Sequence, residues 1–279
     1  MTSIAPRRDE LTLPTGIRLH YQYHPGPQDA PCLVLLHSLG MDHSFWRLVA
    51  PALAAKQPVL CIDLRGHGKS DKPAGPYTVK EMADDAAQLA QALGHGRLVA
   101  AGASLGGCAA LQLAIGHPER TAALGLIDTT AWYGDTARAD WSSRAEKARA
   151  EGLASLVPFQ QTRWFSDEFR QRHPDIVAEC VDTFVRNDMQ GYEATCLALG
   201  AFDARPALSS LRMPVSVIVG EQDYATPVAM ATQLQQAIPG ASLKVIAGAR
   251  HLTPLEAPGD VIAMLEGLLQ RAHATETQR

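Results

Sequence analysis

Short continuous runs of apolar residues recur along this chain, and longer stretches with helical spacing separate them. Uninterrupted apolar runs are typical of strands buried on both faces of a parallel sheet. Such runs predict strands at residues 32–36, 58–64, 98–101, 122–127, 215–219 and 243–246. Near the start, residues 8–13 and 17–23 alternate apolar and polar positions around a Pro-Thr-Gly turn, which predicts a hairpin at a sheet edge.

The clearest helix begins at Thr78, which forms a T-x-x-E capping box with Glu81 and is followed by apolar residues on one face as far as Gly94. Further helices are predicted at residues 45–53, at 105–115 and in the amphipathic stretch after Val261. Thr226-Pro227 predicts another helix start, with threonine as the cap and proline as the first helical residue. Strands alternating with helices predict an α/β fold, a mostly parallel sheet of about eight strands flanked by helices.

One region breaks the alternation. Residues 131–204 contain no convincing strand but do contain helical stretches near 138–150, 175–186 and 192–202. An insertion between two strands of such a sheet lies over their carboxyl ends, where open α/β sheets bind ligands. We therefore predict a core formed by residues 1–130 and 205–279, and an inserted helical cap, or lid, formed by residues 131–204.

Composition and charge exclude several function classes. The formal net charge of -4 and the absence of a basic run give no indication of nucleic-acid binding. No apolar run approaches the length of a membrane span, and the amino-terminal residues lack the apolar core of a signal peptide. The five cysteines form no C-x-x-C pair, and Cys32, Cys61 and Cys108 lie inside apolar segments, which favours buried thiols in a reducing, cytoplasmic setting. Nothing in the sequence indicates an oligomeric state.

The segment around Ser104 carries the strongest candidate chemistry. Gly102-Ala103-Ser104-Leu105-Gly106 follows an apolar strand, precedes an apolar helix, and fits the G-x-S-x-G pattern of a serine nucleophile at a sharp strand-to-helix turn. Glycine at 102 and 106 avoids collisions with the neighbouring strand and helix. The alternative is a plain glycine-rich turn with an incidental serine.

A serine nucleophile needs a base, and the base needs an acid to orient it. His251 follows the last predicted strand, and Asp223 follows the strand at 215–219. The order Ser104, Asp223, His251 is the one expected for this sheet. Glu221 and Asp128 are alternative acids. The other histidines considered, His37, His67 and His95, belong to turns or helix ends and lack metal-ligand spacing, so no metal is expected.

An oxyanion in such a site needs two backbone N–H donors. We assign them to Leu105, directly after Ser104, and to Leu39, in the loop after the strand at 32–36. Their side chains are expected to pack in the interior.

Together these motifs resemble the α/β-hydrolase family. The resemblance rests on H-S-L-G at 37–40, D-L-R-G-H-G-K-S at 63–70, G-A-S-L-G-G at 102–107, G-E-Q-D at 220–223 and His251. Within that family the chain is most similar to the 3-oxoadipate enol-lactonase branch, through S-L-G-M-D-H-S-F-W at 38–46, R-G-H-G-K-S with P-x-G-P-Y-T at 65–78, and D-T-T-A-W-Y-G at 128–134. The family often has H-G-x-G or N-S-L-G where this chain has H-S-L-G.

The resemblance implies a serine hydrolase that cleaves a small ester or lactone through an acyl-enzyme, without a cofactor, and 3-oxoadipate enol-lactone is the candidate substrate. It also implies that Trp132 faces the substrate. A carboxylated lactone needs a cation, and Arg163 beside Trp164 is our candidate, with Arg138, Arg144 and Arg65 as rivals. Alternative functions are a carboxylesterase, a hydrolase of C–C bonds in ring-fission products, and a ligand receptor that keeps the fold without turnover.

Overall fold

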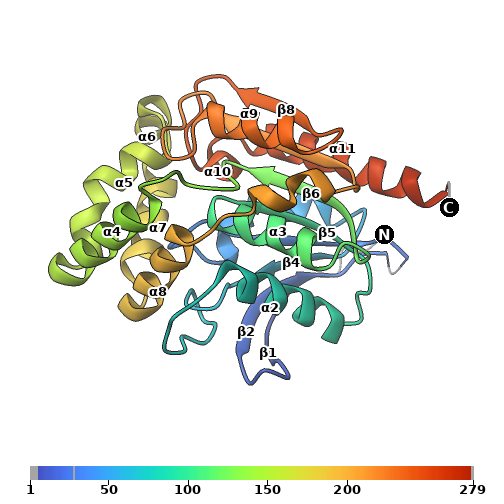
Figure 1. The fold of residues 1–279 in the computed structure, drawn as a ribbon, viewed down its shortest axis with the longest axis horizontal. Helices are drawn as coiled ribbons and strands as arrows, with labels where there is room; N and C mark the ends of the chain where they lie inside the picture. Colours follow the sequence, from blue (N-terminus) through green and yellow to red (C-terminus); the bar gives the residue numbers. More distant parts are fainter. Residues whose placement is uncertain (1–5, 28, 278–279) are drawn as a thin grey trace.

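The structure is a computed structural model that describes residues 6–27 and 29–277. Eight strands form one sheet in the order β1-β2-β4-β3-β5-β6-β7-β8 (Figure 1). Their bounds are Arg7–Thr12 (β1), Arg18–His24 (β2), Cys32–Leu36 (β3), Val59–Ile62 (β4), Leu98–Ala103 (β5), Thr121–Ile127 (β6), Val215–Gly220 (β7) and Ser242–Ile246 (β8). The first two pair with each other, and β2 with β4, in antiparallel fashion, and the other neighbours are parallel. The predicted α/β fold with about eight strands is confirmed.

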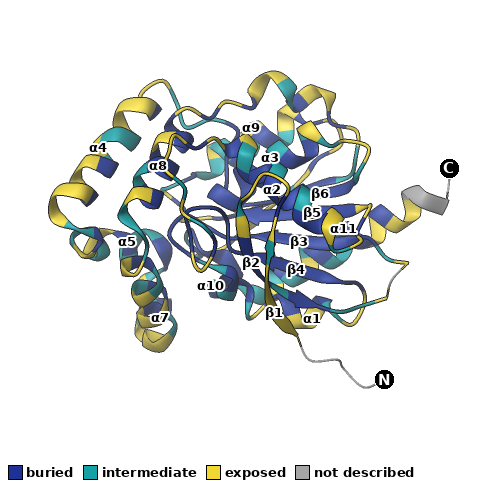
Figure 2. Ribbon diagram, turned by 90° about the horizontal axis from the view of Figure 1, so that it is seen from below, coloured by how far each residue is buried: buried dark blue, intermediate teal, exposed yellow. Residues whose placement is uncertain are grey.

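Helices cover both faces of the sheet, and Figure 2 shows the strands as the buried layer between them. On one face α2 (Val79–Ala92) packs against α3 (Leu105–Gly116), while α9 (Val228–Ala237) packs on β7. On the other face α1 (Ala50–Leu53) contacts α11 (Pro258–Thr277), which also packs on β6 and β7. The short helix α10 (Thr253–Glu256) leads into α11. No helix among the described residues is long and apolar enough to cross a lipid bilayer.

The central strand β5 is buried along its whole length and lies between β3 and β6. Because β3 to β8 are mutually parallel, their carboxyl ends lie at one edge of the sheet. Ser104 follows β5 there, Asp128 follows β6, and the loops after β7 and β8 carry Asp223 and His251. The sheet therefore gathers residues from distant parts of the sequence at that edge.

Two local predictions are wrong. The helix predicted at 45–53 is divided into a 3-10 turn, η1 (His43–Trp46), and α1, because Pro51 lacks an N–H and fits only in the first turn of a new helix. The predicted cap Thr226 lies one residue too early, since Pro227 is the N-cap of α9. The Thr226 hydroxyl instead donates to Asp223 Oδ2 at 2.9 Å.

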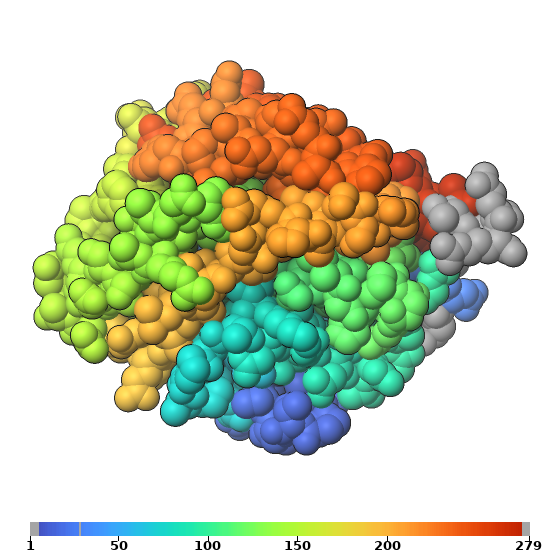
Figure 3. All heavy atoms as spheres, in the orientation of Figure 1, coloured from blue at the N-terminus to red at the C-terminus, as the bar shows by residue number. Residues whose placement is uncertain are grey.

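Five helices lie between β6 and β7: α4 (Ala137–Glu151), α5 (Val157–Trp164), α6 (Asp167–Arg172), α7 (Pro174–Val185) and α8 (Met189–Gly200). The 3-10 turn η2 (Leu153–Leu156) lies between α4 and α5, and η3 (Arg205–Ser210) follows α8. These five helices form one end of the molecule, yellow-green to gold in Figure 3. All five fall within the range we predicted for the cap, although the division into core and cap at those boundaries stays a prediction.

Helices α5 and α6 are not predicted by the sequence pattern. Phe159 is 58% exposed, so the apolar positions of α5 do not follow one helical face. The signals that could have found these helices are Pro158 in the first turn of α5 and Ser166, whose hydroxyl caps α6 by accepting from the Phe169 N–H at 3.2 Å.

A buried histidine pair, His37 and His67, is expected to make the stability of this fold sensitive to acid. His67 is fully buried, its ring centroid lies 5.1 Å from that of His37, and its Nε2 has no hydrogen-bond partner among the described residues. Burial, reinforced by His37, lowers the pKa of His67 to about 3. As the pH falls below about 6.5, His67 therefore binds a proton in the unfolded chain but remains neutral in the folded protein.

We expect this difference to cost about 2 kcal/mol of unfolding free energy between pH 7 and pH 5. Urea unfolding at the two pH values measures the loss. In His67→Leu the protein should be less stable at pH 7 but should lose less on acidification. An unchanged pH dependence in that variant would show that other groups cause the acid sensitivity.

Candidate active site

Ser104 occupies a strained turn between β5 and α3. Its φ of 55° and ψ of -117° lie outside the regions that non-glycine residues ordinarily adopt. A Cβ at position 102 would lie 2.1 Å from the Gly106 carbonyl oxygen, and one at position 106 would lie 2.0 Å from the Leu36 carbonyl oxygen. Both glycines are therefore required where the pattern predicted them. The turn is held by the Ser104 N–H, which donates to Ile127 O at 3.0 Å.

His251 and Asp223 continue from Ser104 in one hydrogen-bonded chain. His251 Nε2 lies 2.9 Å from Ser104 Oγ, and His251 Nδ1 lies 2.8 Å from Asp223 Oδ2. All three side chains are largely buried, with 4–7% of each residue exposed. If Nδ1 carries the imidazole proton and donates it to Asp223, Nε2 is free to accept the Ser104 hydroxyl proton.

The loop after β7 holds Asp223 firmly in the ionised form. Its Oδ1 accepts from the N–H groups of Ala225 at 2.7 Å and Thr226 at 2.9 Å. Burial raises the pKa of Asp223, but His251 and the Thr226 hydrogen bonds outweigh burial and hold the pKa below its usual value. Glu221, a rival acid, is exposed and accepts instead from the Gly248 N–H at 2.9 Å.

Asp128, the other rival, makes no hydrogen bond to His251 but joins the loops on either side of it. Its Oδ1 accepts from the Gly220 N–H at 3.1 Å, and its Oδ2 accepts from the Thr253 N–H at 3.0 Å and hydroxyl at 2.6 Å. Complete burial, together with the charge of Asp223, raises the pKa of Asp128 well above its usual value. Asp128 thus fixes the end of β7 and the residues after His251 relative to each other.

The backbone N–H groups of Leu39 and Leu105 have no acceptor among the described residues, as the predicted oxyanion site requires. His37 orients the loop that carries Leu39, because its Nε2 accepts from the Leu64 N–H at 3.0 Å and its Nδ1 therefore donates to Ser38 O at 2.8 Å. In a trans peptide the C=O and N–H point in opposite directions. Holding the Ser38 carbonyl on one side therefore directs the Leu39 N–H to the other.

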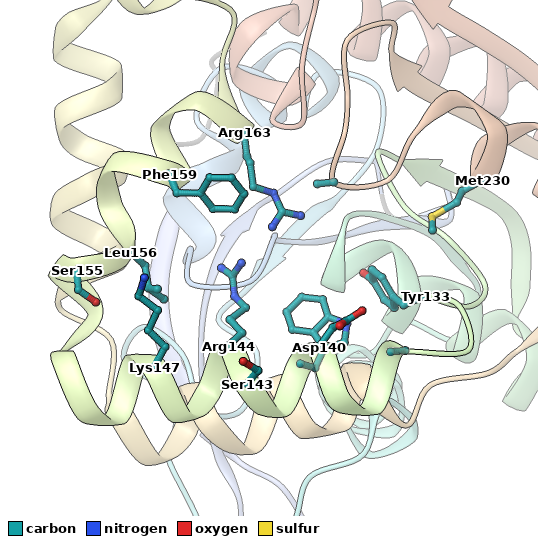
Figure 4. Close-up of a pocket in the computed structure, with 13 residues that line it drawn as sticks. Tyr133, Asp140, Ser143, Arg144, Lys147, Ser155, Leu156, Phe159, Arg163 and Met230 are labelled. Atoms are coloured by element: carbon teal, nitrogen blue, oxygen red, sulfur yellow. The ribbon is translucent and has the colours of Figure 1, made fainter.

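A cavity of about 510 Å³ lies between the cap helices and the loops after β6 and β7. Figure 4 shows Arg163 of α5 and Arg144 of α4 pointing toward each other across it. Arg144 donates to neutral acceptors, the Tyr192 hydroxyl at 2.8 Å and Gln160 Oε1 at 3.3 Å. The Arg163 guanidinium lies 5.4 Å from the Phe159 ring centroid and has no carboxylate partner among the described residues. Burial, with the charge of Arg144, lowers the pKa of Arg163.

The structure separates the predicted pocket residues. Arg163 lines the cavity, but Trp132 lies outside it, beneath Arg205, whose guanidinium is 3.5 Å from the indole centroid. Trp164 is 2% exposed and packs edge-on against Phe184 with ring centroids 5.4 Å apart. Neither tryptophan lines the cavity, because the Trp132 segment bridges to Asp203 and Trp164 is turned into the interior of the cap.

The carboxyl end of α5 is joined to the histidine loop. The His251 and Leu252 N–H groups donate to the carbonyls of Arg163 and Trp164, at 3.4 and 3.0 Å. Arg250 Nη1 donates to the carbonyls of Thr162 and Phe165, at 2.7 and 3.1 Å. The backbone of Arg163 is thus directly bonded to the residue that faces Ser104.

The residues His20, His43 and Asp63 are close enough together to be considered as a metal site. However, both carboxylate oxygens of Asp63 are already occupied. They accept from the Nδ1 atoms of His20 at 2.9 Å and His43 at 2.8 Å, and from the N–H groups of His43 at 2.6 Å and Lys69 at 2.9 Å. This donor set fits a structural cluster that anchors the loop after β4, rather than a cation site. The five cysteines are all buried free thiols.

Two further residues line the cavity beside Arg163. The sequence indicates Arg144 only as a rival cation and gives no indication of a role for Tyr133. Helical spacing gives no sign that Arg144 faces inward, because α4 is polar on most of its surface. Tyr133 stands directly after Trp132, to which the resemblance drew attention instead.

Comparison with known proteins agrees with this geometry. The model of the alpha/beta hydrolase fold family matches residues 31–258. The chain is 34% identical over 264 residues to 3-oxoadipate enol-lactonase 2 of Acinetobacter baylyi, covering 95% of this chain and 97% of that protein. The crystal structure of the enol-lactonase of Burkholderia xenovorans superposes with a TM-score of 0.89 and 34% identity, covering 94% of this chain and all of that one. A malate-bound thermophilic esterase of Thermogutta terrifontis superposes with a TM-score of 0.88 and 28% identity, covering 96% of this chain and 99% of that one.

A serine at a strained strand-to-helix turn, with histidine and aspartate at the same sheet edge, defines a hydrolase-type site. The chain belongs to the α/β-hydrolase family. Within it the chain is similar to the enol-lactonases.

Proposed function

We propose that Ser104, His251 and Asp223 form the catalytic triad of a serine hydrolase that acts on small, carboxylated lactones or esters. The observation that carries this proposal is the unbroken chain of hydrogen bonds from Ser104 Oγ through His251 to Asp223. The enol-lactonases among its relatives support a lactone as substrate, and 3-oxoadipate enol-lactone is the candidate we favour.

In the proposed reaction Ser104 Oγ attacks the substrate carbonyl carbon as its proton passes to His251 Nε2. The amides of Leu39 and Leu105 bind the resulting oxyanion. Asp223 stabilises the imidazolium that forms. Collapse of the tetrahedral intermediate breaks the bond to the leaving oxygen, which takes the proton from His251. Water, activated by the same histidine, then attacks the acyl-enzyme carbonyl and releases Ser104.

The charge of the cavity supports a carboxylated substrate. Arg163 and Arg144 face each other without a carboxylate between them, and two like charges in a half-buried space repel. A substrate carboxylate would relieve that repulsion and could accept bidentate hydrogen bonds from a guanidinium. The hydrogen bond between the His251 N–H and the Arg163 carbonyl would then help to hold the bound carboxylate at a fixed position relative to the reacting atoms.

The experiment that tests the proposal is a turnover panel with 3-oxoadipate enol-lactone, neutral lactones, linear esters and C–C substrates of the ring-fission type. Wild-type protein is compared with Ser104→Ala. Hydrolysis of the lactone that disappears in the variant is the expected result. Preferred turnover of linear esters would indicate a carboxylesterase, preferred cleavage of C–C substrates would indicate that class of hydrolase, and binding without turnover would indicate a receptor.

Arg163→Met should raise KM for a carboxylated lactone about tenfold or more, the scale of one lost charge-assisted contact. It should leave a neutral ester nearly unaffected. Arg138→Met, which removes the same charge from an exposed position on α4, serves as the matched control. Equal losses on both substrates would show a general disturbance of the cap. An unchanged KM for both substrates would show that Arg163 does not bind the substrate carboxylate.

We further propose a cytoplasmic location. It is supported by five free cysteines, all of them buried, since proteins of reducing compartments keep their thiols unpaired.

A further inference from the structure

Tyr133 lines the cavity, and its phenol hydroxyl is a neighbour of both Cys108 and Ser104. The residue lies in the loop between β6 and α4, and its ring packs edge-on against Trp141 with centroids 5.2 Å apart. Its side chain lines the cavity together with Arg163 (Figure 4). At the inner end, the hydroxyl lies 3.7 Å from Cys108 Sγ and is close enough to Ser104 for hydrogen bonding with that side chain to influence its pKa.

This hydroxyl remains protonated, and its neighbouring acceptors are a thiol sulfur and the Ser104 hydroxyl. Burial raises the pKa of Tyr133 well above its usual value, so the group acts as a hydrogen-bond donor and not as a base. A thiol sulfur is a weak acceptor. The Cys108 sulfur is also in contact with the Thr129 hydroxyl and the Thr130 carbonyl, each at 3.5 Å. Ser104 Oγ is the other neighbouring acceptor. It becomes a weaker acceptor once it is bonded to the acyl carbon of the substrate, which frees the Tyr133 hydroxyl to donate elsewhere.

A partly buried tyrosine O–H usually has a partner. Here the hydroxyl lies beside Cys108 and Ser104, at the site of the proposed nucleophile. The oxyanion donors Leu39 and Leu105 belong to the loop after β3 and the start of α3, whereas Tyr133 approaches Ser104 from the loop after β6. The cavity that Tyr133 lines is also bordered by Arg163, whose backbone bonds to His251. Tyr133 thus reaches Ser104 from a different loop than the two oxyanion donors do, so its hydroxyl can serve another oxygen of the substrate.

We propose that Tyr133 is a further catalytic residue, whose hydroxyl donates a hydrogen bond to the leaving oxygen of the substrate. As the bond between the carbonyl carbon and the leaving oxygen breaks, its electron pair moves to that oxygen. Tyr133 stabilises the developing charge while keeping its own proton, and His251 Nε2 supplies the proton that the oxygen finally carries. The proposal rests on the proposed function, in which Ser104 is the nucleophile.

The test is a series of esters that share one acyl group and differ in the leaving group, assayed with wild type and Tyr133→Phe. Poor leaving groups such as alkoxides accumulate more charge on oxygen and need the hydrogen bond more. We expect kcat/KM to fall about tenfold to hundredfold for an alkyl ester and by less than about threefold for a nitrophenyl ester. A thioester with the same alkyl group should also be little affected, because sulfur accepts hydrogen bonds weakly.

Tyr23→Phe is the matched control. It also removes a buried hydroxyl, one hydrogen-bonded to His95 Nε2 at 3.1 Å, but on β2, away from the catalytic edge of the sheet. It should leave the whole series unchanged. If Tyr133→Phe fails to fold, Tyr133→Met replaces it in the same comparison, since methionine is also apolar and flexible enough to fill the space.

A loss that is equal for all leaving groups, or no loss at all, would overturn the role of Tyr133 while leaving the triad intact. Wild-type protein that hydrolyses none of the esters or lactones in a Ser104-dependent manner would instead overturn the proposed function.

Discussion

Ser104→Ala and His251→Ala should each lower kcat by about 10⁴-fold or more, and the double variant should be little worse than either single one. The reason is geometric. In the wild-type protein the proton acceptor His251 Nε2 lies 2.9 Å from Ser104 Oγ. When the serine hydroxyl is removed, His251 has no nucleophile to activate. With the imidazole removed, the serine hydroxyl keeps its proton and remains a poor nucleophile. Either substitution therefore abolishes the same step, and the effects of the two on kcat should not add.

The measurement is kcat on the best substrate of the turnover panel, with unfolding curves to show that each variant is folded. Ser142→Ala and His117→Ala provide matched controls. Ser142 lies on α4 and bonds to Glu146 at 3.1 Å, and His117 lies at the far end of α3 and contacts Asp84 at 3.1 Å. Both should retain full activity. Losses that multiply in the double variant would contradict a single catalytic unit.

The sequence was sufficient for those parts of the fold in which local pattern and tertiary environment agree. The strand Cys32–Leu36 is apolar because it is buried on both faces, and its bounds were predicted without error. The capping box of Thr78 and Glu81 is likewise a local feature, and both of its hydrogen bonds are present. Ser104 could be singled out because its turn tolerates only glycine two residues before it, at 102, and two residues after it, at 106.

The cap was harder to predict because its helices bury few residues in a regular pattern. On α4 only Ala137, Ala145 and Ala148 are buried, and most of the side chains that α4 turns toward the cavity are polar or charged: Asp140, Ser143, Arg144 and Lys147. Such a surface looks the same in sequence as one that faces solvent. Trp132 is the clearest case, since an aromatic residue beside the site was expected to face the substrate and instead stacks beneath Arg205. The direction of a loop side chain depends on tertiary contacts that no local pattern encodes.

The choice among Asp223, Glu221 and Asp128 also needed the structure, because all three follow strands that end at the same edge. What distinguishes them is the direction of each carboxylate. Asp223 Oδ2 faces His251 Nδ1, the Glu221 carboxylate faces the Gly248 N–H, and Asp128 is surrounded by donors from Gly220 and Thr253.

Asp223→Asn should fold and yet lose about 10⁴-fold in kcat. Asp223 Oδ1 accepts two backbone N–H groups, those of Ala225 and Thr226. The amide oxygen of asparagine must occupy that position, since an NH₂ group there would face two donors. The NH₂ group is then placed where Oδ2 now faces His251 Nδ1. It can only donate, so Nδ1 becomes the acceptor, Nε2 carries the proton, and the imidazole cannot receive the proton of Ser104.

Glu221→Gln is the matched control, because it makes the same change from carboxylate to amide two residues away. It should retain nearly all activity, since the side-chain oxygen of glutamine can still accept from the Gly248 N–H. The measurement is kcat for both variants on one substrate, with unfolding free energies taken alongside. A larger loss in Glu221→Gln than in Asp223→Asn would assign the acid to Glu221. Equal and small losses would mean that His251 keeps its working tautomer without a carboxylate, and would remove Asp223 from the triad.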